Sequence, residues 1–327
     1  MTDMRTMTYG EAIREALAEE MRRDPAVILY GEDVAGFGGI FGVLAGLREE
    51  FGERVFDTPI SENAIVGSAV GAAMRGMRPV AELQFADFIL CAADEVFLKA
   101  GAWRYAHDGA VKLPLVIRTA SGGMGFGPEH SQCPEAYVMH TPGLRLAVPS
   151  TPADAKGLLK TAIRSDDPVV FLEHKLLYWT QGEVPAGGDV LVPFGTARVR
   201  RSGDALTIVA WQEMLRRALV AADQLSKDGI EVEIVDPVTL NPFDVETLLA
   251  SVRKTGGCLV VEEGYRTLGV GAEIGALLME HAFGDLDKPL RRLAIPDVPI
   301  PTAVHLVDSL LPGVNDIVAA TRELIGR

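Results

Sequence analysis

Short apolar runs alternate with amphipathic segments along almost the whole chain, and this alternation limits the fold more than any other feature. Residues 27–30, 79–83 and 113–118 have the pattern of buried strands, whereas 8–23 and 152–165 carry apolar residues at helical spacing. Strands that are apolar on both faces and separated by helices are typical of parallel sheets covered on both sides. The sequence therefore predicts an α/β fold with doubly wound sheets.

The alternation is interrupted once, and we expect two domains. Between Gly182 and Gly203 the pattern gives way to proline, glycine and short apolar residues, which is typical of a connection. We therefore expect a first domain over residues 1–182, a linker over 183–203 and a second domain over 204–327. A chain of 327 residues is long enough to build a core in each domain.

The composition excludes several classes of function. A net charge of -14 would repel a polyphosphate, so we expect no nucleic-acid partner. Three widely spaced cysteines indicate neither a zinc site nor a disulfide framework and fit a reducing compartment. The first residues lack the apolar core of a signal peptide, and no apolar run reaches about 18 residues, the length of a membrane span. We expect a cytoplasmic protein with no membrane partner.

The stretch 57–71, D-T-P-I-S-E-N-A-I-V-G-S-A-V-G, places one carboxylate at the start of an apolar helix. Ser61 is a candidate N-cap, and Glu62 falls in the first turn, where exposed amide groups favour an anion. Gly67 and Gly71 weaken a helix, so we expect close packing against this face. Two interpretations remain open at this point: an ordinary capped helix, and a desolvated acid that holds a proton at neutral pH.

Other polar or aromatic residues follow expected strands. Glu32, Gln84, Phe88 and His130 lie just beyond strand ends, and ligands of doubly wound sheets bind at the carboxyl ends of strands. Taken by themselves, Phe88 is better explained as an aromatic core residue and His130 as an ordinary surface histidine. The glycine-rich loop 36–42 lacks the G-x-G-x-x-G spacing, which argues against a dinucleotide site.

Several longer motifs resemble one family. The chain is similar to the β subunit of the decarboxylating component of 2-oxo acid dehydrogenase complexes, which oxidise pyruvate, branched-chain 2-oxo acids or acetoin. The resemblance extends from Thr8 to Leu324. Its motifs are D-T-P-I-S-E-N (57–63), A-E-L-Q-F-A-D-F (81–88), E-H-S-Q-C-P-E-A (129–136), P-G-L-R-L-A-V-P-S-T-P (142–152), P-V-V-F-L-E-H-K-L-L-Y (168–178) and R-L-A-I-P-D-V-P-I-P (292–301).

The resemblance implies a shared active site. It predicts a transketolase-like pyrimidine-binding domain followed by a transketolase C-terminal-like domain. It also implies an α2β2 heterotetramer that binds thiamin diphosphate between α and β chains, with magnesium bound mainly by the α subunit. The family's magnesium-diphosphate motif begins Gly-Asp-Gly, and this chain contains no such triplet. The expected reaction is oxidative decarboxylation of a small 2-oxo acid, with acyl transfer to the lipoyl group of an acyltransferase partner.

The resemblance also assigns roles to individual residues. Glu62 is implied to hydrogen-bond a ring nitrogen of the thiamin pyrimidine, with its pKa kept high by apolar surroundings. His130 is implied to lie near the thiazolium ring and to hold substrate or serve the transfer to lipoate. The other residues implied on the cofactor side are Ile60, Gln84, Phe88 and Glu32.

Members of the family also bind potassium through backbone carbonyls that brace the active-site loop. The positions that match are Leu115, Ala162, Ile163, Ser165 and Asp167. The family often has Asp and Asn where this chain has Ser165 and Asp167. A loop at 121–129 about one residue shorter than in several relatives leaves the choice among pyruvate, branched-chain acids and acetoin open.

Two further hypotheses remain. Another thiamin-dependent transferase, such as a split transketolase-like synthase, would share Glu62 but not the H-S-Q motif at 130–132. A scaffolding or nucleotide-binding module would need no thiamin, and it would leave the polar residues at the strand ends without a role.

Overall fold

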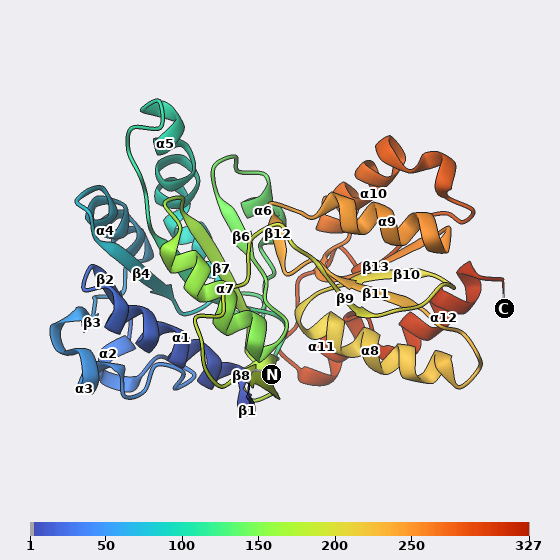
Figure 1. Ribbon diagram of the computed structural model, residues 1–327, viewed down its shortest axis with the longest axis horizontal. Coiled ribbons are helices and arrows are strands. Elements are labelled where there is room, and N and C mark those ends of the chain that lie inside the picture. The colour runs from blue at the N-terminus through green and yellow to red at the C-terminus, as the bar shows by residue number, and fades with distance from the viewer. Residues whose placement is uncertain (1–2, 327) are drawn as a thin grey trace. The chain divides into compact units, whose positions relative to one another are not determined.

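The computed structural model describes residues 3–326, which form two compact units (Figure 1). The first unit runs to Ser121 and resumes at Tyr137–Phe194. The second unit comprises Gly122–Ala136 and the chain from Gly195 onward. The later boundary lies inside the segment 183–203, where we expected the linker. The earlier one removes residues 122–136 from the expected first domain and joins them to the second unit.

The first unit is built around a parallel sheet, with its strands in the order β6-β7-β5-β4-β2-β3. β1 and β8 form a separate antiparallel pair. The strands are β1 Met4–Thr8, β2 Val27–Gly31, β3 Val55–Asp57, β4 Arg78–Leu83, β5 Val116–Ser121, β6 Arg145–Ala147, β7 Val169–His174 and β8 Gln181–Pro185. The helices are α1 Tyr9–Arg23, α2 Val34–Phe37, α3 Leu47–Phe51, η1 Gly52–Arg54, α4 Glu62–Met74, η2 Ala86–Ala92, η3 Asp94–Ala100, α5 Gly101–Ala106, α7 Pro152–Arg164 and η4 Lys175–Leu177, with α6 Glu135–Met139 crossing the boundary.

The order of the strands fixes where a ligand can bind. From β2 the chain passes to β3 on one side and then to β4 on the other, so β2 and β4 form the topological switch point of the sheet. Ligands of open α/β sheets bind at the carboxyl ends of such a strand pair. The expectation of a doubly wound parallel sheet is confirmed.

Capping residues define the helices that cover this sheet. Thr8 and Glu11 form a capping box at the start of α1, and Thr151 accepts a hydrogen bond from Asp154 N at the start of α7. Ion pairs join the two helices, because Lys160 Nζ lies 2.7 Å from Glu19 Oε2. The packing and the charges together place α1 beside α7.

The second unit has its own sheet, in the order β14-β13-β10-β11-β9, with β9 antiparallel to β11 and the other neighbours parallel. Leucine, isoleucine, valine and alanine residues of this sheet, α8 and α12 form one core. The strands are β9 Arg198–Arg201, β10 Thr207–Ala210, β11 Glu233–Asp236, β12 Thr239–Asn241, β13 Cys258–Tyr265 and β14 Arg291–Ile295. The helices are α8 Gln212–Ser226, α9 Val245–Thr255, α10 Val270–His281, η5 Phe283–Asp285, α11 Val304–Leu310 and α12 Val314–Leu324.

Two details differ from the prediction. The sequence from Ile89 to about Arg104 predicts a single helix, but the structure divides this region into 3₁₀, π and α segments, whose apolar periods are too similar to separate by sequence. β1 was not expected, because its M-R-T-M-T sequence has a partner only in β8, far along the chain. Over residues 3–326, no helix is both long and apolar enough to cross a bilayer.

Candidate active site

Two carboxyl groups interact at the switch point. Glu32 follows β2 directly, is 8% exposed, and its Oε1 has no hydrogen-bond partner among residues 3–326. Burial raises the pKa of Glu32, and the nearby charges of Glu62 and Asp33 raise it further. The structure therefore brings together Glu32 and Glu62, two of the acids that the sequence singled out.

The start of α4 is formed as expected. Ser61 Oγ accepts a hydrogen bond from Ala64 N at 3.4 Å, so the N-cap is confirmed and Glu62 lies in the first turn. Glu62 is half-buried in the single chain. Ile60, two residues earlier, is 82% exposed. The carboxylate thus lies beside an exposed apolar side chain at the rim of the sheet.

The glycines of α4 behave differently from one another. A Cβ built on Gly67 would lie 3.2 Å from Glu95 Cδ, which confirms close packing at this position. A Cβ built on Gly71 would meet no atom of residues 3–326 within 4 Å, so close packing of another backbone or a ligand at Gly71 stays a prediction.

Gln84 and Phe88 extend the site from β4. Gln84 Nε2 donates a hydrogen bond to Asp33 Oδ2 at 3.3 Å, which joins the ends of the two switch-point strands. Phe88 is half-buried, and its ring contacts Phe85 edge-on with centroids 5.8 Å apart. Phe85 is buried as an ordinary core residue, whereas Phe88 presents part of its ring at the surface.

Asp57 is a site residue that the sequence reasoning missed. Its Oδ1 accepts a hydrogen bond from Ala35 N at 2.6 Å, and its Oδ2 accepts one from Gly36 N at 3.0 Å. Asp57 thereby holds the loop that follows Glu32 against the segment that leads to Glu62. The only signal was an acid at the start of the D-T-P-I-S-E-N motif.

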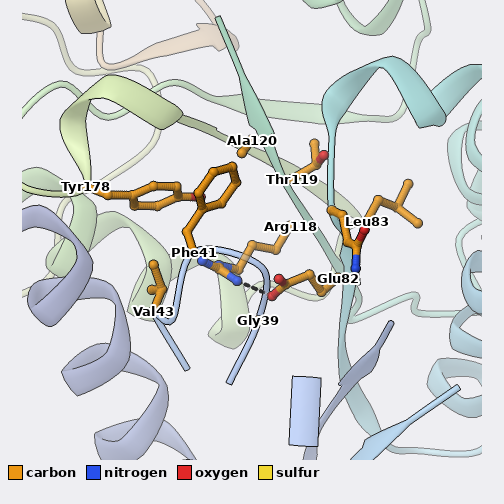
Figure 2. Close-up of a pocket in the computed structure, with 10 residues that line it drawn as sticks. Gly39, Phe41, Val43, Glu82, Leu83, Arg118, Thr119, Ala120 and Tyr178 are labelled. Carbon is orange, nitrogen blue, oxygen red and sulfur yellow. Dashed lines mark hydrogen bonds and ion pairs between the residues drawn. The ribbon is translucent and has the colours of Figure 1, made fainter. Parts of the chain in front are cut away.

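A buried ionic cluster lies beneath the strand ends (Figure 2). Arg118 of β5 is 2% exposed and pairs with Glu82 of β4 and Glu173 of β7, and Tyr178 Oη donates to Glu173 Oε2 at 2.7 Å. Burial raises the pKa of Glu82 to about 7, with Arg118 opposing the shift and Glu173 reinforcing it. One guanidinium therefore joins three neighbouring strands between two acids.

The glycine-rich loop closes over this cluster. Phe41 packs against Tyr178 with ring centroids 5.1 Å apart and meets the Phe85 ring at 5.9 Å. The two rings of Phe41 and Tyr178 lie side by side in Figure 2. A cavity of about 10 Å³, the size of one water molecule, remains between Gly39, Glu82 and Arg118. The glycine-rich loop thus covers the buried charges.

His130 belongs to the second unit, whereas Glu32 and Glu62 belong to the first. It is half-buried in the segment Gly122–Ala136. The segment turns at this point, because His130 N donates to Gly127 O at 3.3 Å and Gln132 Nε2 donates to Pro128 O at 2.7 Å. The structure therefore places His130 in the second unit. The other candidate site residues discussed above lie in the first unit, namely Glu32, Glu62, Gln84 and Phe88.

Comparisons with known proteins agree with this architecture. Residues 5–180 match the transketolase pyrimidine-binding domain, and residues 195–317 match the transketolase C-terminal domain. The chain is 45% identical to the 2-oxoisovalerate dehydrogenase subunit beta of Bacillus subtilis, over 98% of this chain and 99% of that one. It is 44% identical to the pyruvate dehydrogenase E1 component subunit beta of Rhizobium meliloti, over 98% of this chain and 70% of that one.

A third relative has a different substrate in its name. The acetoin:2,6-dichlorophenolindophenol oxidoreductase subunit beta of Cupriavidus necator is 43% identical, over 98% of this chain and 97% of that one. The chain belongs to this family of β subunits, within the transketolase-like enzymes. A split-gene transketolase, solved as an inactive β4 tetramer, has the same fold at 24% identity, with a TM-score of 0.81 over 98% of this chain and 99% of that one.

The family uses thiamin diphosphate, and the first unit fits the pyrimidine end of that cofactor. A buried acid oxygen without a partner, a half-buried acid, a half-buried phenyl ring and an exposed isoleucine lie around one switch point. Residues 3–326 offer no comparable set of side chains for the diphosphate end of the cofactor. The Gly-Asp-Gly triplet is absent from the sequence, and residues 3–326 contain no group of three or more His, Cys, Asp or Glu residues arranged to hold a metal ion.

The carbonyls expected to bind potassium all accept hydrogen bonds within the chain. Arg78 Nη1 donates to both Ile163 O and Ser165 O at 3.0 Å. A guanidinium of the chain therefore already contacts two of the carbonyls that are expected to bind the ion. The remaining pairs are Val169 N to Leu115 O at 3.0 Å, Ser165 N to Ala162 O at 3.1 Å and Ser165 Oγ to Asp167 O at 3.0 Å.

Proposed function

We propose that this chain is the β half of a thiamin diphosphate-dependent 2-oxo acid dehydrogenase and supplies the pyrimidine side of the active site. The observation that supports it most directly is the pair of neighbouring acids, Glu32 and Glu62, at the β2/β4 switch point of a transketolase pyrimidine-binding domain. Relatives that match nearly the whole chain act on 2-oxo acids by name. Their substrates differ, so the assays below include more than one 2-oxo acid.

Glu62 is the proposed proton carrier. Bound thiamin diphosphate would supply a nucleophilic thiazolium carbon, whose ionisation depends on the tautomer of the pyrimidine ring. The Glu62 carboxyl group would donate a proton to, and accept it from, the N1′ ring nitrogen. Glu32, with its raised pKa, would remain protonated more readily than an exposed glutamate and would limit the negative charge beside Glu62.

The neighbouring side chains would orient the ring and exclude water. Phe88 offers a partly exposed ring face for stacking, and Ile60 offers an apolar side chain at the rim. Gln84 is held by Asp33 and would line the same pocket. A partner that covers Ile60 would also exclude water from Glu62.

The proposed partner is an α subunit in an α2β2 assembly. It would contribute the diphosphate and magnesium site, for which this chain lacks the motif. His130 would contact the substrate or assist transfer of the acyl group to the lipoyl group of an acyltransferase component. The exposed Ile60 and the half-buried Glu62 support a site that is completed by another chain.

A second candidate is the β subunit of an acetoin dehydrogenase. The 43% identity to the acetoin relative is close to the values for the 2-oxo acid relatives, so identity alone does not separate the three substrates. Both candidates require the same Glu62 chemistry and differ in the substrate end of the pocket.

The test is reconstitution with an α chain of the same family. The pair is assayed with pyruvate, branched-chain 2-oxo acids and acetoin, by carbon dioxide release or reduction of an artificial acceptor. We expect turnover with a 2-oxo acid, and loss of about 100-fold or more in Glu62→Gln, whereas the exposed control Glu49→Gln stays at the wild-type rate. Near-normal turnover in Glu62→Gln would refute the proton transfer, and turnover with acetoin alone would favour the second candidate.

A further inference from the structure

The segment that carries His130 belongs structurally to the second unit, although it leaves a strand of the first. β5 ends at Ser121, and Gly122–Ala136 then packs with the chain that begins at Gly195. The sequence alone places His130 in the first domain. The contacts of the segment show which residues hold it.

One buried carboxylate is hydrogen-bonded to the beginning of the segment. Glu263 Oε1, from β13, accepts a hydrogen bond from Gly123 N at 2.8 Å, and Glu263 is only 5% exposed. A hydrogen bond to an ionised acceptor is among the stronger ones, and burying a carboxylate is costly unless it is satisfied. The bond therefore fixes the backbone of Gly123 to β13.

A second polar contact holds the end of the segment. Trp211 Nε1 donates to Glu135 Oε1 at 3.4 Å, and both residues are almost completely buried. Trp211 directly precedes α8, so this contact is made to a different element of the second unit than the first. His130 lies between the two attachment points.

The glycines of the segment give independent support. A Cβ on Gly125 would lie 2.7 Å from Val304 Cγ2, and a Cβ on Gly127 would lie 3.0 Å from Thr302 Oγ1. Both glycines also have positive φ angles, of 83° and 87°, which other residues rarely adopt. The backbone thus fits tightly against the start of α11.

We propose that Glu263 and Glu135 are positioning residues for His130: by attaching both ends of its segment to β13 and Trp211, they make the C-terminal unit responsible for placing the imidazole. This inference deepens the proposed function and rests on it for the role of His130. The C-terminal domain would then contribute to acyl transfer by positioning His130. Its core would not need to contact the cofactor.

The first test measures the attachment itself. Amide hydrogen exchange of the full chain is compared in wild type, Glu263→Ala, Glu263→Gln and the exposed control Glu280→Ala. We expect exchange across 122–136 to accelerate about tenfold or more in Glu263→Ala, equivalent to about 1.4 kcal/mol, while β10 stays protected. Glu263→Gln retains an acceptor oxygen and should restore most of the protection. Unchanged exchange in Glu263→Ala would overturn the proposal.

The second test asks whether the attachment acts through His130. In the reconstituted enzyme, Glu263→Ala should reduce acyl transfer to a lipoyl domain about tenfold, mainly in kcat. It should have no further effect in a His130→Ala background, because the residue being positioned is gone. Losses that add in the double variant would overturn the proposal. A wild-type pair with no thiamin-dependent turnover would refute the proposed function instead, and the exchange comparison would still decide the attachment.

Discussion

Replacing Glu82 by glutamine should make the first unit more stable at alkaline pH. Glu82 shares Arg118 with Glu173, and with both acids ionised the buried cluster has one negative charge in excess. Burial raises the pKa of Glu82 from 4.5 to about 7. The folded state therefore binds this proton more tightly than the unfolded state.

The sign and the size of the effect follow from that difference. Below the unfolded pKa, Glu82 is protonated in both states and contributes no penalty. As pH rises towards about 7, the unfolded chain releases the proton first, so the stability of the folded state declines. At about 1.36 kcal/mol for each pKa unit, the full penalty is about 3 kcal/mol. Glutamine has the shape of the protonated acid and removes the penalty.

Urea denaturation of the full chain, followed by circular dichroism, measures the effect. The free energy of unfolding of Glu82→Gln minus that of wild type should be near zero at about pH 4 and should rise by about 3 kcal/mol by about pH 8. The exposed control Glu49→Gln should show no such trend. A difference that stays constant between these pH values, or that falls, would refute the assignment of a raised pKa to Glu82.

Three further predictions concern other parts of the chain. Arg78→Met should lower the melting temperature, and added potassium rather than sodium should restore part of it, whereas wild type should be insensitive to the choice of cation. Gly125→Ala should destabilise the second unit by about 2–4 kcal/mol through backbone strain and overpacking, against about 1 kcal/mol for Gly188→Ala, which has room for a methyl group, in calorimetry. Arg164 lowers the pKa of the exposed Asp189, so Asp189→Asn should cost under about 1 kcal/mol at neutral pH, and the cost should be lost only on acidification well below about pH 3.

Features encoded over a few residues could be predicted from the sequence. The runs at 27–30 and 79–83 are strands because continuous apolar residues are buried on both faces of a parallel sheet. Ser61 caps α4 because a hydroxyl two or three residues before free amide groups satisfies them wherever the helix lies. These are local interactions, and neither needs a distant partner.

Features that depend on distant pairing could not be predicted. The hydrogen bond from Gln84 to Asp33 and the salt bridge from Arg118 to Glu173 each join strands separated by some fifty residues. The attachment of the His130 segment to Glu263 spans 140 residues. Sequence periodicity reports which face of an element is apolar, but not which side chain lies opposite a polar residue once the sheet is assembled.

Glutamate residues occupy two kinds of position in this fold. They differ in whether an arginine lies beside the carboxyl group. Glu82 and Glu173 flank Arg118 deep in the sheet, so their contacts with one guanidinium join three strands. Glu32 and Glu62 lie at the carboxyl ends of the strands, where Glu32 Oε1 has no partner within residues 3–326 and the charge of Glu62 helps to raise the pKa of Glu32. This arrangement fits the proposed function, in which the acids beneath the strand ends brace the sheet and Glu62 at the rim exchanges a proton with one nitrogen of the cofactor ring.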